Sequence, residues 1–330
     1  MRLIQFLQEN RLTVGCVESD SQVRVVEGEG GVYALAQRAI SESRPLTEVI
    51  EAALSETRVD YAELVEHRRL LPPLTHVDPA HCLVTGTGLT HLGSADTRSA
   101  MHAAQKVDES ELTDSMRMFR MGLEAGKPAH GKVGPQPEWF YKGDGDCVVP
   151  PEADIPSPAF AQDAGEEPEL AGLYVIGEDG TPWRVGYAIG NEFSDHVTER
   201  FNYLWLAHSK LRACSFGPEL LIGELPESLE GTSRIVRDGR VLWEKPFATG
   251  EANMAHSLAN LEHHHFKYDN FRRAGDVHVH FFGTATLSFA DNVVVEPGDR
   301  YEIQLDAFGR TLRNTLTLAD DRGYSAATAL

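Results

Sequence analysis

Two glutamates separated by one residue stand at the start of an apolar segment, in the stretch GEEPELAGLYVI (residues 165–176). In an extended chain the side chains at positions i and i+2 project to the same face, so the carboxylates of Glu167 and Glu169 would lie close together. Carboxylates placed in this way either raise one another's pKa or share a cation. The alternative is a solvated acidic turn before a strand, because most charged residues lie at the surface.

A second apolar segment, RVGYAIGNEFSDH (residues 184–196), delivers a third acidic group as it ends. Its last glycine is followed by Asn191 and Glu192, and two adjacent strands can bring Glu192 beside the first two carboxylates. Three carboxylates satisfy about half of the octahedral shell of Mg²⁺ and leave positions for water and a bidentate substrate. This spacing therefore predicts a site for a divalent metal ion.

The rest of the pattern predicts two domains. Residues 1–75 contain strand-like segments (RLIQFL, LTVGCV, QVRVVE) and two helical ones (VYALAQRAISES, LTEVIEAALSE), which indicates a small N-terminal α+β domain. The stretch LLPPLTHVDP, with its three prolines, is the best boundary. Residues 76–330 form the second domain, in which a polar helical stretch is predicted from about Thr97 to Ala125. From EWFYKGDG onward strands dominate, with one helix among them in GEANMAHSLANLEHHHF.

Composition and charge exclude several classes of protein. The chain has 330 residues, 42% of them hydrophobic, so it can bury a sizeable core. Its net charge is −20 and no segment concentrates basic and aromatic residues, which argues against a nucleic-acid partner. With no apolar run of membrane-spanning length and no signal peptide, we expect a cytoplasmic protein with no membrane partner. Its four scattered cysteines are expected to be reduced and mostly buried.

An ordered set of motifs resembles the fumarylacetoacetate hydrolase superfamily. The set comprises Glu-x-Glu-Leu-Ala entering a strand, the Gly-Tyr-x-x-x-Asn-acid-x-Ser turn, a lysine eighteen residues later in SKLRACSFGPELL, the pair Gly283-Thr284, and VEPGDRYEIQLDAFGRTLRNTL near the end. The resemblance covers roughly residues 80–318. It implies an α+β fold with a mixed β-roll/β-sandwich core, preceded by the small N-terminal α+β domain.

The resemblance also implies a metal ion, usually Mg²⁺ with Mn²⁺ as the alternative, held by Glu167, Glu169 and Glu192. The usual residue at position 192 is aspartate, so the longer Glu192 is a departure. Asp195, three residues further on, stays a rival ligand at this point.

Other roles follow from the same resemblance. Lys210 and His91 match the catalytic residues, and Thr284 matches the residue that binds the substrate carboxylate. We assign Gly283 and Glu199 to substrate binding as well. In hydrolase members the histidine pairs with a glutamate to activate water, whereas here Ser94 stands three residues after His91.

The implied reaction is dehydration of a 2-keto-3-deoxy sugar acid, such as L-2-keto-3-deoxyarabonate, to 2-oxoglutarate semialdehyde in non-phosphorylative sugar breakdown. His91 or a water that it orients would donate a proton to the departing hydroxyl, while Lys210 or a nearby carboxylate would remove the C3 proton; the two roles could be exchanged. The small-molecule partner would be an oxo acid, and relatives are commonly homodimers. The alternatives are a carbon–carbon bond hydrolase of a diketo sugar acid, an oxo-acid decarboxylase, and a metal-free sugar-acid binding protein.

Several further residues attract a functional interpretation that we do not adopt. The histidines of LEHHHF point about 100° apart on a helix and cannot all face one ion, so a solvated or packed role is expected. His278 and His280 share one face of a strand and are expected in the core or beside the pocket. Lys142 is expected to contribute to pocket or dimer structure, with no catalytic role.

Overall fold

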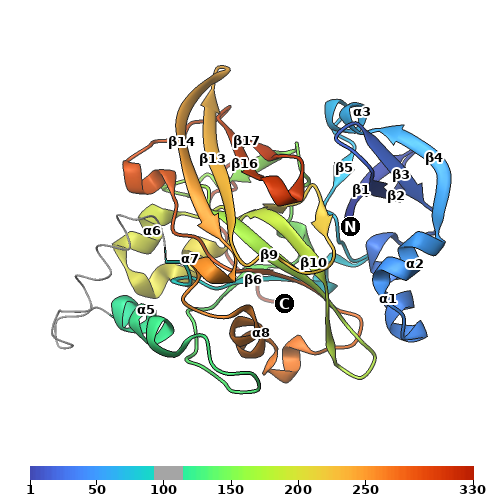
Figure 1. The fold of residues 1–330 in the computed structure, drawn as a ribbon. Helices are drawn as coiled ribbons and strands as arrows, with labels where there is room; N and C mark the ends of the chain where they lie inside the picture. The colour runs from blue at the N-terminus through green and yellow to red at the C-terminus, as the bar shows by residue number, and fades with distance from the viewer. Residues whose placement is uncertain (93–113) are drawn as a thin grey trace.

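The structure, a computed structural model, describes residues 1–92 and 114–330, and within that part the strands form two sheets (Figure 1). The larger sheet has, in spatial order, the strands β4 (Leu54–Asp60), β3 (Gln22–Val26), β2 (Arg11–Val17), β1 (Arg2–Gln8), β12 (Leu220–Leu221), β10 (Pro182–Asn191), β9 (Pro168–Ile176), β15 (Val277–Phe281), β6 (Cys82–Gly86) and β7 (Phe140–Gly143), with β5 (Leu70–Leu71) beside β1 and β11 (Ser215–Phe216) beside β10. The smaller sheet has the order β14 (Arg240–Thr249), β13 (Leu229–Arg237), β16 (Arg300–Leu305), β17 (Leu312–Leu318) and β8 (Asp154–Ser157). Most pairs are antiparallel, while β15–β6 and β17–β8 are parallel.

The described helices are short and lie outside the sheets. They are α1 (Gly31–Glu42), α2 (Leu46–Ala52), α3 (Tyr61–Glu66), α5 (Asp114–Ala125), α6 (His196–Phe201), α7 (Leu206–Lys210) and α8 (Leu258–Phe266). In Figure 1 α3 lies above the N-terminal strands and α1 and α2 lie below them, while α5 and α8 lie below the sheets. Among the residues that the structure describes, no helix combines the length and the apolar character needed to cross a bilayer.

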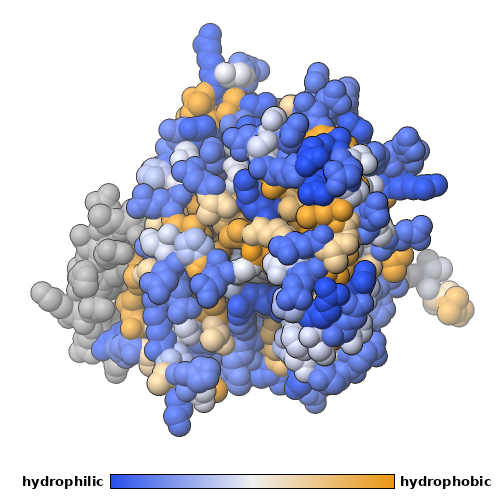
Figure 2. Space-filling view, turned by 45° about the vertical axis from the view of Figure 1, so that its right-hand side comes forward, coloured by the Kyte–Doolittle hydropathy of each residue, from blue (hydrophilic) through white to orange (hydrophobic). Residues whose placement is uncertain are grey.

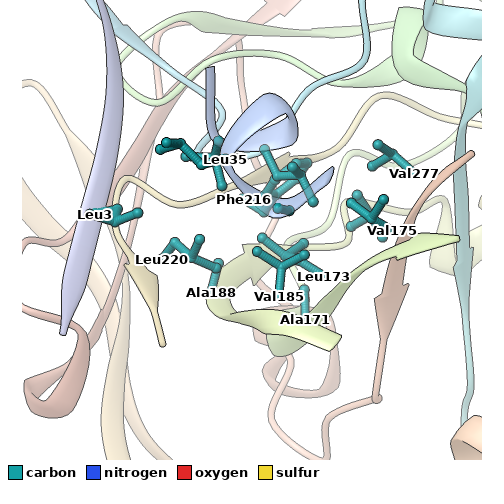
Figure 3. Close-up of a cluster of buried hydrophobic side chains, with 14 of the residues drawn as sticks. Leu3, Leu35, Ala171, Leu173, Val175, Val185, Ala188, Phe216, Leu220 and Val277 are labelled. Atoms are coloured by element: carbon teal, nitrogen blue, oxygen red, sulfur yellow. The ribbon is translucent and has the colours of Figure 1, made fainter. Parts of the chain in front are cut away.

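The larger sheet runs without a break from the N-terminal strands into the centre of the molecule. Leu3 pairs with Leu220, which joins β1 to β12. The buried cluster in Figure 3 likewise combines Leu3 and Leu35 from the N-terminal part with Leu173 and Val277 from the central strands. The division at residue 75 stays a prediction, and across it the chain shares one sheet and one core.

The second core lies between the two sheets. Leu170 and Ile189 of the larger sheet pack with Ile303 and Leu305 of the smaller one, and Leu261 of α8 joins them. Two packed sheets with mixed strand directions and peripheral helices confirm the predicted α+β class with a mixed β core.

Two predicted helices are shorter than the pattern suggested. LTEVIEAALSE ends its helix at Ala52, and the chain from Leu54 pairs with β3 as a strand. In GEANMAHSLANLEHHHF the helix begins only at Leu258, with Ser257 as its cap. Before it the chain forms only a 3-10 turn at Glu251–Asn253, and the Ala255 N–H donates outside the stretch, to the Thr90 carbonyl at 2.7 Å.

The surface reflects the acidic composition. Figure 2 shows hydrophilic side chains over most of one face, with hydrophobic residues gathered in smaller areas between them. The β13–β14 hairpin projects from the molecule in Figure 1. Ion pairs such as Arg234–Glu244 link its two strands, and exposed pairs of this kind contribute at most about 1 kcal/mol each.

Candidate active site

The register of β9 and β10 brings the three predicted acidic ligands together. Asn191 is the partner of Pro168 across these antiparallel strands, so Glu192 lies opposite Glu167 and its N–H donates to the Glu167 carbonyl at 3.1 Å. Glu167, Glu169 and Glu192 are all buried, and each offers a carboxylate oxygen within 4.8 Å of the others. The surface-turn alternative for the glutamate pair is therefore wrong. We call these three residues the carboxylate trio.

Lys210 lies directly against the trio. Its ammonium donates hydrogen bonds to Glu167, to Glu192 at 2.6 Å and to the Ser194 hydroxyl at 3.1 Å. Burial alone would lower the pKa of Lys210, but Glu167, Glu192 and Glu199 raise it well above its usual value. The lysine therefore supplies positive charge between two of the carboxylates.

A second buried lysine, Lys142 of β7, fixes the third carboxylate. Its ammonium donates to the Glu192 carboxylate at 2.6 Å, to the Phe193 carbonyl at 2.7 Å and to the Lys210 carbonyl at 3.1 Å. It thereby ties the Glu192 turn to the end of α7. The sequence interpretation expected a structural role for Lys142, and its position 50 residues before Glu192 gave no signal of this contact.

His196 also contacts the carboxylate trio, and the sequence analysis did not identify it. Its Nε2 lies 3.0 Å from a Glu167 oxygen and its Nδ1 lies 3.0 Å from Asp163. Burial lowers the pKa of His196, but hydrogen bonds to Asp163 and Glu167 raise it to about 10. A histidine directly after the acid-rich turn was the available signal, but its partner Asp163 is distant in sequence.

Asp195, the rival ligand, points away from the trio. Its carboxylate accepts hydrogen bonds from the Thr198 N–H at 2.9 Å, the Gln162 N–H at 2.9 Å and Arg212 at 3.0 Å. These contacts cap α6 and bury an ion pair. Of the two acidic residues, only Glu192 lies with the other two carboxylates.

Glu169 has the least compensated charge of the trio. Its Oε2 accepts the Gly283 N–H at 2.7 Å, while burial and the neighbouring Glu167 and Glu192 raise its pKa well above the usual value. Thr284 follows directly in the loop after β15, where it is half-buried and accepts a hydrogen bond from the Thr286 N–H at 3.3 Å. The predicted Gly283-Thr284 pair is therefore held at the trio through the Gly283 backbone.

Gly283 is required by both conformation and space. Its φ is +90°, and a Cβ there would lie 2.3 Å from Thr90 Oγ1. Gly283→Ala should lower the free energy of unfolding by about 1–3 kcal/mol, measured by urea denaturation. Gly298→Ala is the matched control, because Gly298 shares a positive φ of +97° but has open space around the added methyl, so its loss should be smaller. Equal losses in the two variants would contradict the steric argument.

Glu199 lies at the edge of this arrangement. Its Oε2 is 3.9 Å from the Lys210 ammonium and has no hydrogen-bond partner within the described parts of the chain. Burial and the charge of Glu167 raise the pKa of Glu199 against the opposing pull of Lys210. A carboxylate oxygen without a hydrogen-bond partner beside a lysine could accept a hydrogen bond from a bound molecule.

His91 is buried in a network of threonines. The Thr90 hydroxyl donates to the Phe282 carbonyl, so its oxygen accepts from His91 Nδ1 at 3.0 Å. His91 Nε2 is then unprotonated and accepts from the Thr249 hydroxyl at 2.9 Å. Burial lowers the pKa of His91 to about 4, which keeps the ring neutral at pH 7. Ser94, which stands where hydrolase members have the glutamate that pairs with this histidine, lies outside the described residues.

A cavity of about 270 Å³ lies beside α7. Leu206 of α7 lines it together with Trp139, Tyr268 and the carboxyl-bearing Glu138. The sequence analysis did not single out Glu138, since one acid in a proline-rich loop carries no pattern of its own. The cavity provides an apolar wall with a few polar groups next to the helix that carries Lys210.

The donor set of the trio fits a hard divalent cation. The trio and Asp163 supply four carboxylates against three positive groups, Lys142, Lys210 and the His196 ring, so one negative charge is left over. Burial and its two carboxylate neighbours raise the pKa of Glu169, which makes it the carboxylate whose charge is least stabilised. Mg²⁺ prefers carboxylate oxygens and keeps open positions for water and substrate. The buried trio could therefore bind a metal ion, and Glu169 would gain most from one.

Comparisons with known proteins identify two relatives whose names both describe dehydratases of deoxy sugar acids. No family model matches the chain. The chain is 29% identical over 187 residues to a "Probable 2-keto-3-deoxyxylonate dehydratase" of Haloferax volcanii, covering 55% of this chain and 61% of that protein. It is 36% identical over 179 residues to the "2-dehydro-3-deoxy-D-arabinonate dehydratase" of Saccharolobus solfataricus, covering 49% and 58%. The matches therefore span less than two thirds of either relative.

The fold has a solved counterpart. A structure described as "2-keto-3-deoxy-D-arabinonate dehydratase complexed with magnesium and 2,5-dioxopentanoate" superposes with a TM-score of 0.69 at 21% identity, covering 97% of this chain and 99% of that one. At this identity the likeness establishes the fold. In fold and in sequence the chain is similar to the 2-keto-3-deoxy sugar acid dehydratases, which confirms its predicted resemblance to the fumarylacetoacetate hydrolase superfamily.

Proposed function

We propose that this chain is a Mg²⁺-dependent lyase that removes water from a 2-keto-3-deoxy sugar acid. The observation that carries the proposal is the buried carboxylate trio, two members of which accept hydrogen bonds from the Lys210 ammonium. The sequence similarity to two dehydratases of this substrate class supports the same reaction.

The substrate requires two kinds of contact, which we assign to different parts of the site. Glu167, Glu169 and Glu192 would hold Mg²⁺, which when bound polarises the 2-oxo acid and acidifies its C3 protons. Mn²⁺ is the proposed substitute. The substrate carboxylate is assigned to Thr284 and the Gly283 segment, and the hydroxylated end to Glu199 and the cavity beside α7.

The chain's own groups would move the protons. We assign removal of the C3 proton to Glu199, because the raised pKa of Lys210 keeps its ammonium charged; Lys210, 3.9 Å away, would stabilise the negative charge that develops on the substrate. His91 is the proposed donor to the departing C4 hydroxyl. In the neutral ring Nε2 accepts from the Thr249 hydroxyl, so His91 would first have to take up a proton on Nε2, which it would then pass to the departing hydroxyl.

We propose L-2-keto-3-deoxyarabonate as the substrate and 2-oxoglutarate semialdehyde as the product, in the breakdown of L-arabinose. The relatives carry names of xylonate and D-arabinonate derivatives, so the stereochemistry is the first variable to test. A panel of 2-keto-3-deoxy pentonates and hexonates with Mg²⁺ should yield a semialdehyde from at least one pentonate, with the carbon skeleton intact and solvent deuterium incorporated in D₂O. A chelator should abolish the activity and added Mg²⁺ should restore it.

The alternatives give other outcomes in the same assay. Pyruvate released in step with substrate loss would mean carbon–carbon cleavage, and CO₂ release would mean decarboxylation. A sugar-acid binding protein would show a ligand-induced rise in Tm with no turnover. The proposed homodimer is checked independently by light scattering on the purified chain.

A further inference from the structure

Two of the four cysteines lie in contact although they are 67 positions apart in the chain. Cys147 Sγ and Cys214 Sγ are 4.0 Å from each other. Cys214 is fully buried, whereas Cys147 is partly exposed. A small molecule from solvent can therefore reach Cys147, whereas Cys214 is accessible only through Cys147.

The backbones on either side hold the pair in register. The Cys214 N–H donates to the Cys147 carbonyl at 2.9 Å and the Val149 N–H donates to the Cys214 carbonyl at 2.8 Å. Val148 and Cys214 form a parallel β-bridge. The bridge partner of Cys214 is Val148, so Cys147 is its diagonal neighbour on the adjacent segment. A disulfide accepts Cα separations of roughly 4.4–6.8 Å. Side-chain rotation can then bring the sulfur atoms to the bonding distance of about 2.05 Å.

We propose that Cys147 and Cys214 are a reversible disulfide site that closes in the presence of a peroxide. The Cys147 thiolate attacks a peroxide oxygen, which gives Cys147 sulfenic acid and, from hydrogen peroxide, one water. The Cys214 thiol then attacks the sulfenic sulfur, the S–S bond forms, and a second water leaves. In total two thiols lose two hydrogen atoms and one hydrogen peroxide is reduced to two waters.

The surroundings of the two thiols suit these different roles. The hydrogen bond with Cys214 and the nearby Lys142 ammonium lower the pKa of Cys147 against the effect of burial. Burial raises the pKa of Cys214 well above its usual value. The attacking thiolate is therefore Cys147, and the resolving thiol is Cys214.

The disulfide would link the two ends of the segment that carries the candidate active site. Residues 147–214 include the carboxylate trio, His196 and Lys210. Joining the ends of this segment restricts the unfolded chain, so the oxidised protein should unfold at a Tm higher by several degrees, on the order of 5 °C. This inference does not depend on which reaction the site catalyses.

The test is peptide mapping of the whole chain with and without hydrogen peroxide, after blocking of free thiols. Oxidation should protect two cysteines and produce a cross-linked peptide containing Cys147 and Cys214, which dithiothreitol releases. Cys16 and Cys82 serve as internal controls and should stay alkylatable. A cross-link that includes Cys82 instead, or four free thiols after treatment, would overturn the proposal.

Single variants separate the two thiols. Cys214→Ser should leave Cys147 as a sulfenic acid that dimedone traps, whereas Cys147→Ser should leave Cys214 unreacted. Neither variant should show the rise in Tm, and Cys16→Ser should show it in full. Should the variants fold poorly, the mapping on the unaltered chain decides by itself. Oxidation of Cys214 in the Cys147→Ser variant would contradict the assigned order.

Discussion

Glu169→Gln should weaken Mg²⁺ binding at least tenfold and reduce dehydratase turnover by a larger factor. The substitution keeps the size of the side chain but removes one of three anionic ligands, and the one whose charge is least compensated by lysine. Titration calorimetry with Mg²⁺ alone reports the affinity without relying on activity, and the same titration with Mn²⁺ tests the substitute metal.

Glu166→Gln is the matched control for this experiment. Glu166 is a neighbouring buried glutamate whose carboxylate accepts from the Ser288 N–H at 2.8 Å and from its hydroxyl at 2.6 Å. Burial raises the pKa of Glu166 to about 7, so it too is an acid in an apolar setting. Since it does not belong to the trio, its variant should bind Mg²⁺ as the unaltered chain does. Similar affinities in the two variants would remove the metal site from Glu169.

Acidification should destabilise the protein through a cluster of buried histidines. His265 Nε2 lies 3.0 Å from His278 Nδ1, and the His265 ring stacks on His280 with centroids 4.5 Å apart. Burial lowers the pKa of His278 to about 4 and that of His280 to about 3, and it lowers that of His265 well below its usual value. The packed interpretation of the histidine-rich helix is therefore correct for His265.

The sign of the effect follows from these directions. The folded pKa values lie below the unfolded value of about 6.5, so the folded chain excludes protons that the unfolded chain binds. Stability is full above pH 6.5 and falls as the pH drops toward the folded pKa values. At pH 5 each histidine of the cluster costs about 2 kcal/mol. Asp276 raises the pKa of His278 and Arg273 lowers it, so the effects of these two charged residues oppose each other.

His280→Gln isolates one histidine of this cluster. The glutamine can keep the hydrogen bond to Thr85, which His280 Nδ1 makes at 2.8 Å. Between pH 6.5 and 5 the slope of unfolding free energy against pH should decrease by about 1 kcal/mol per pH unit. Replacing the exposed His67 by glutamine should leave the slope unchanged. An unaltered slope in the His280 variant would show that the ring titrates normally.

The sequence revealed the parts of the site that follow from local spacing. Glu167 and Glu169 share a face because of the two-residue period of a strand, and Glu192 follows from the turn that ends the next strand. The contacts of Lys142 with Glu192 and of Asp163 with His196 join distant segments, and no local rule predicts them. The threonine partners of His91 were hidden for the same reason, since Thr249 is 158 residues away.

The ends of helices and strands could be predicted only where the local sequence pattern determines them. The helix after residue 46 was extended too far, because Ala53 and Leu54 favour helix by composition while pairing with β3 draws the chain into a strand. The continuity of the large sheet could not be predicted from the sequence either. It rests on the two-residue strand β12, which is too short to stand out from the pattern.

That two-residue strand also affects the order in which the protein can form during synthesis. The residues of β1 that pair with Leu220 and Leu221 leave the ribosome more than 200 residues earlier, a delay of roughly 10–40 s at about 5–20 residues per second. During that interval β1 can pair with its local neighbours, with β2 along one edge and with β5 at Gln5 and Phe6 on the other. The part of that second edge at Arg2 and Leu3 stays unpaired until β12 is made. An unpaired apolar edge is a template for association with other chains. Slower expression at low temperature, with chaperones present, should therefore favour the recovery of folded protein.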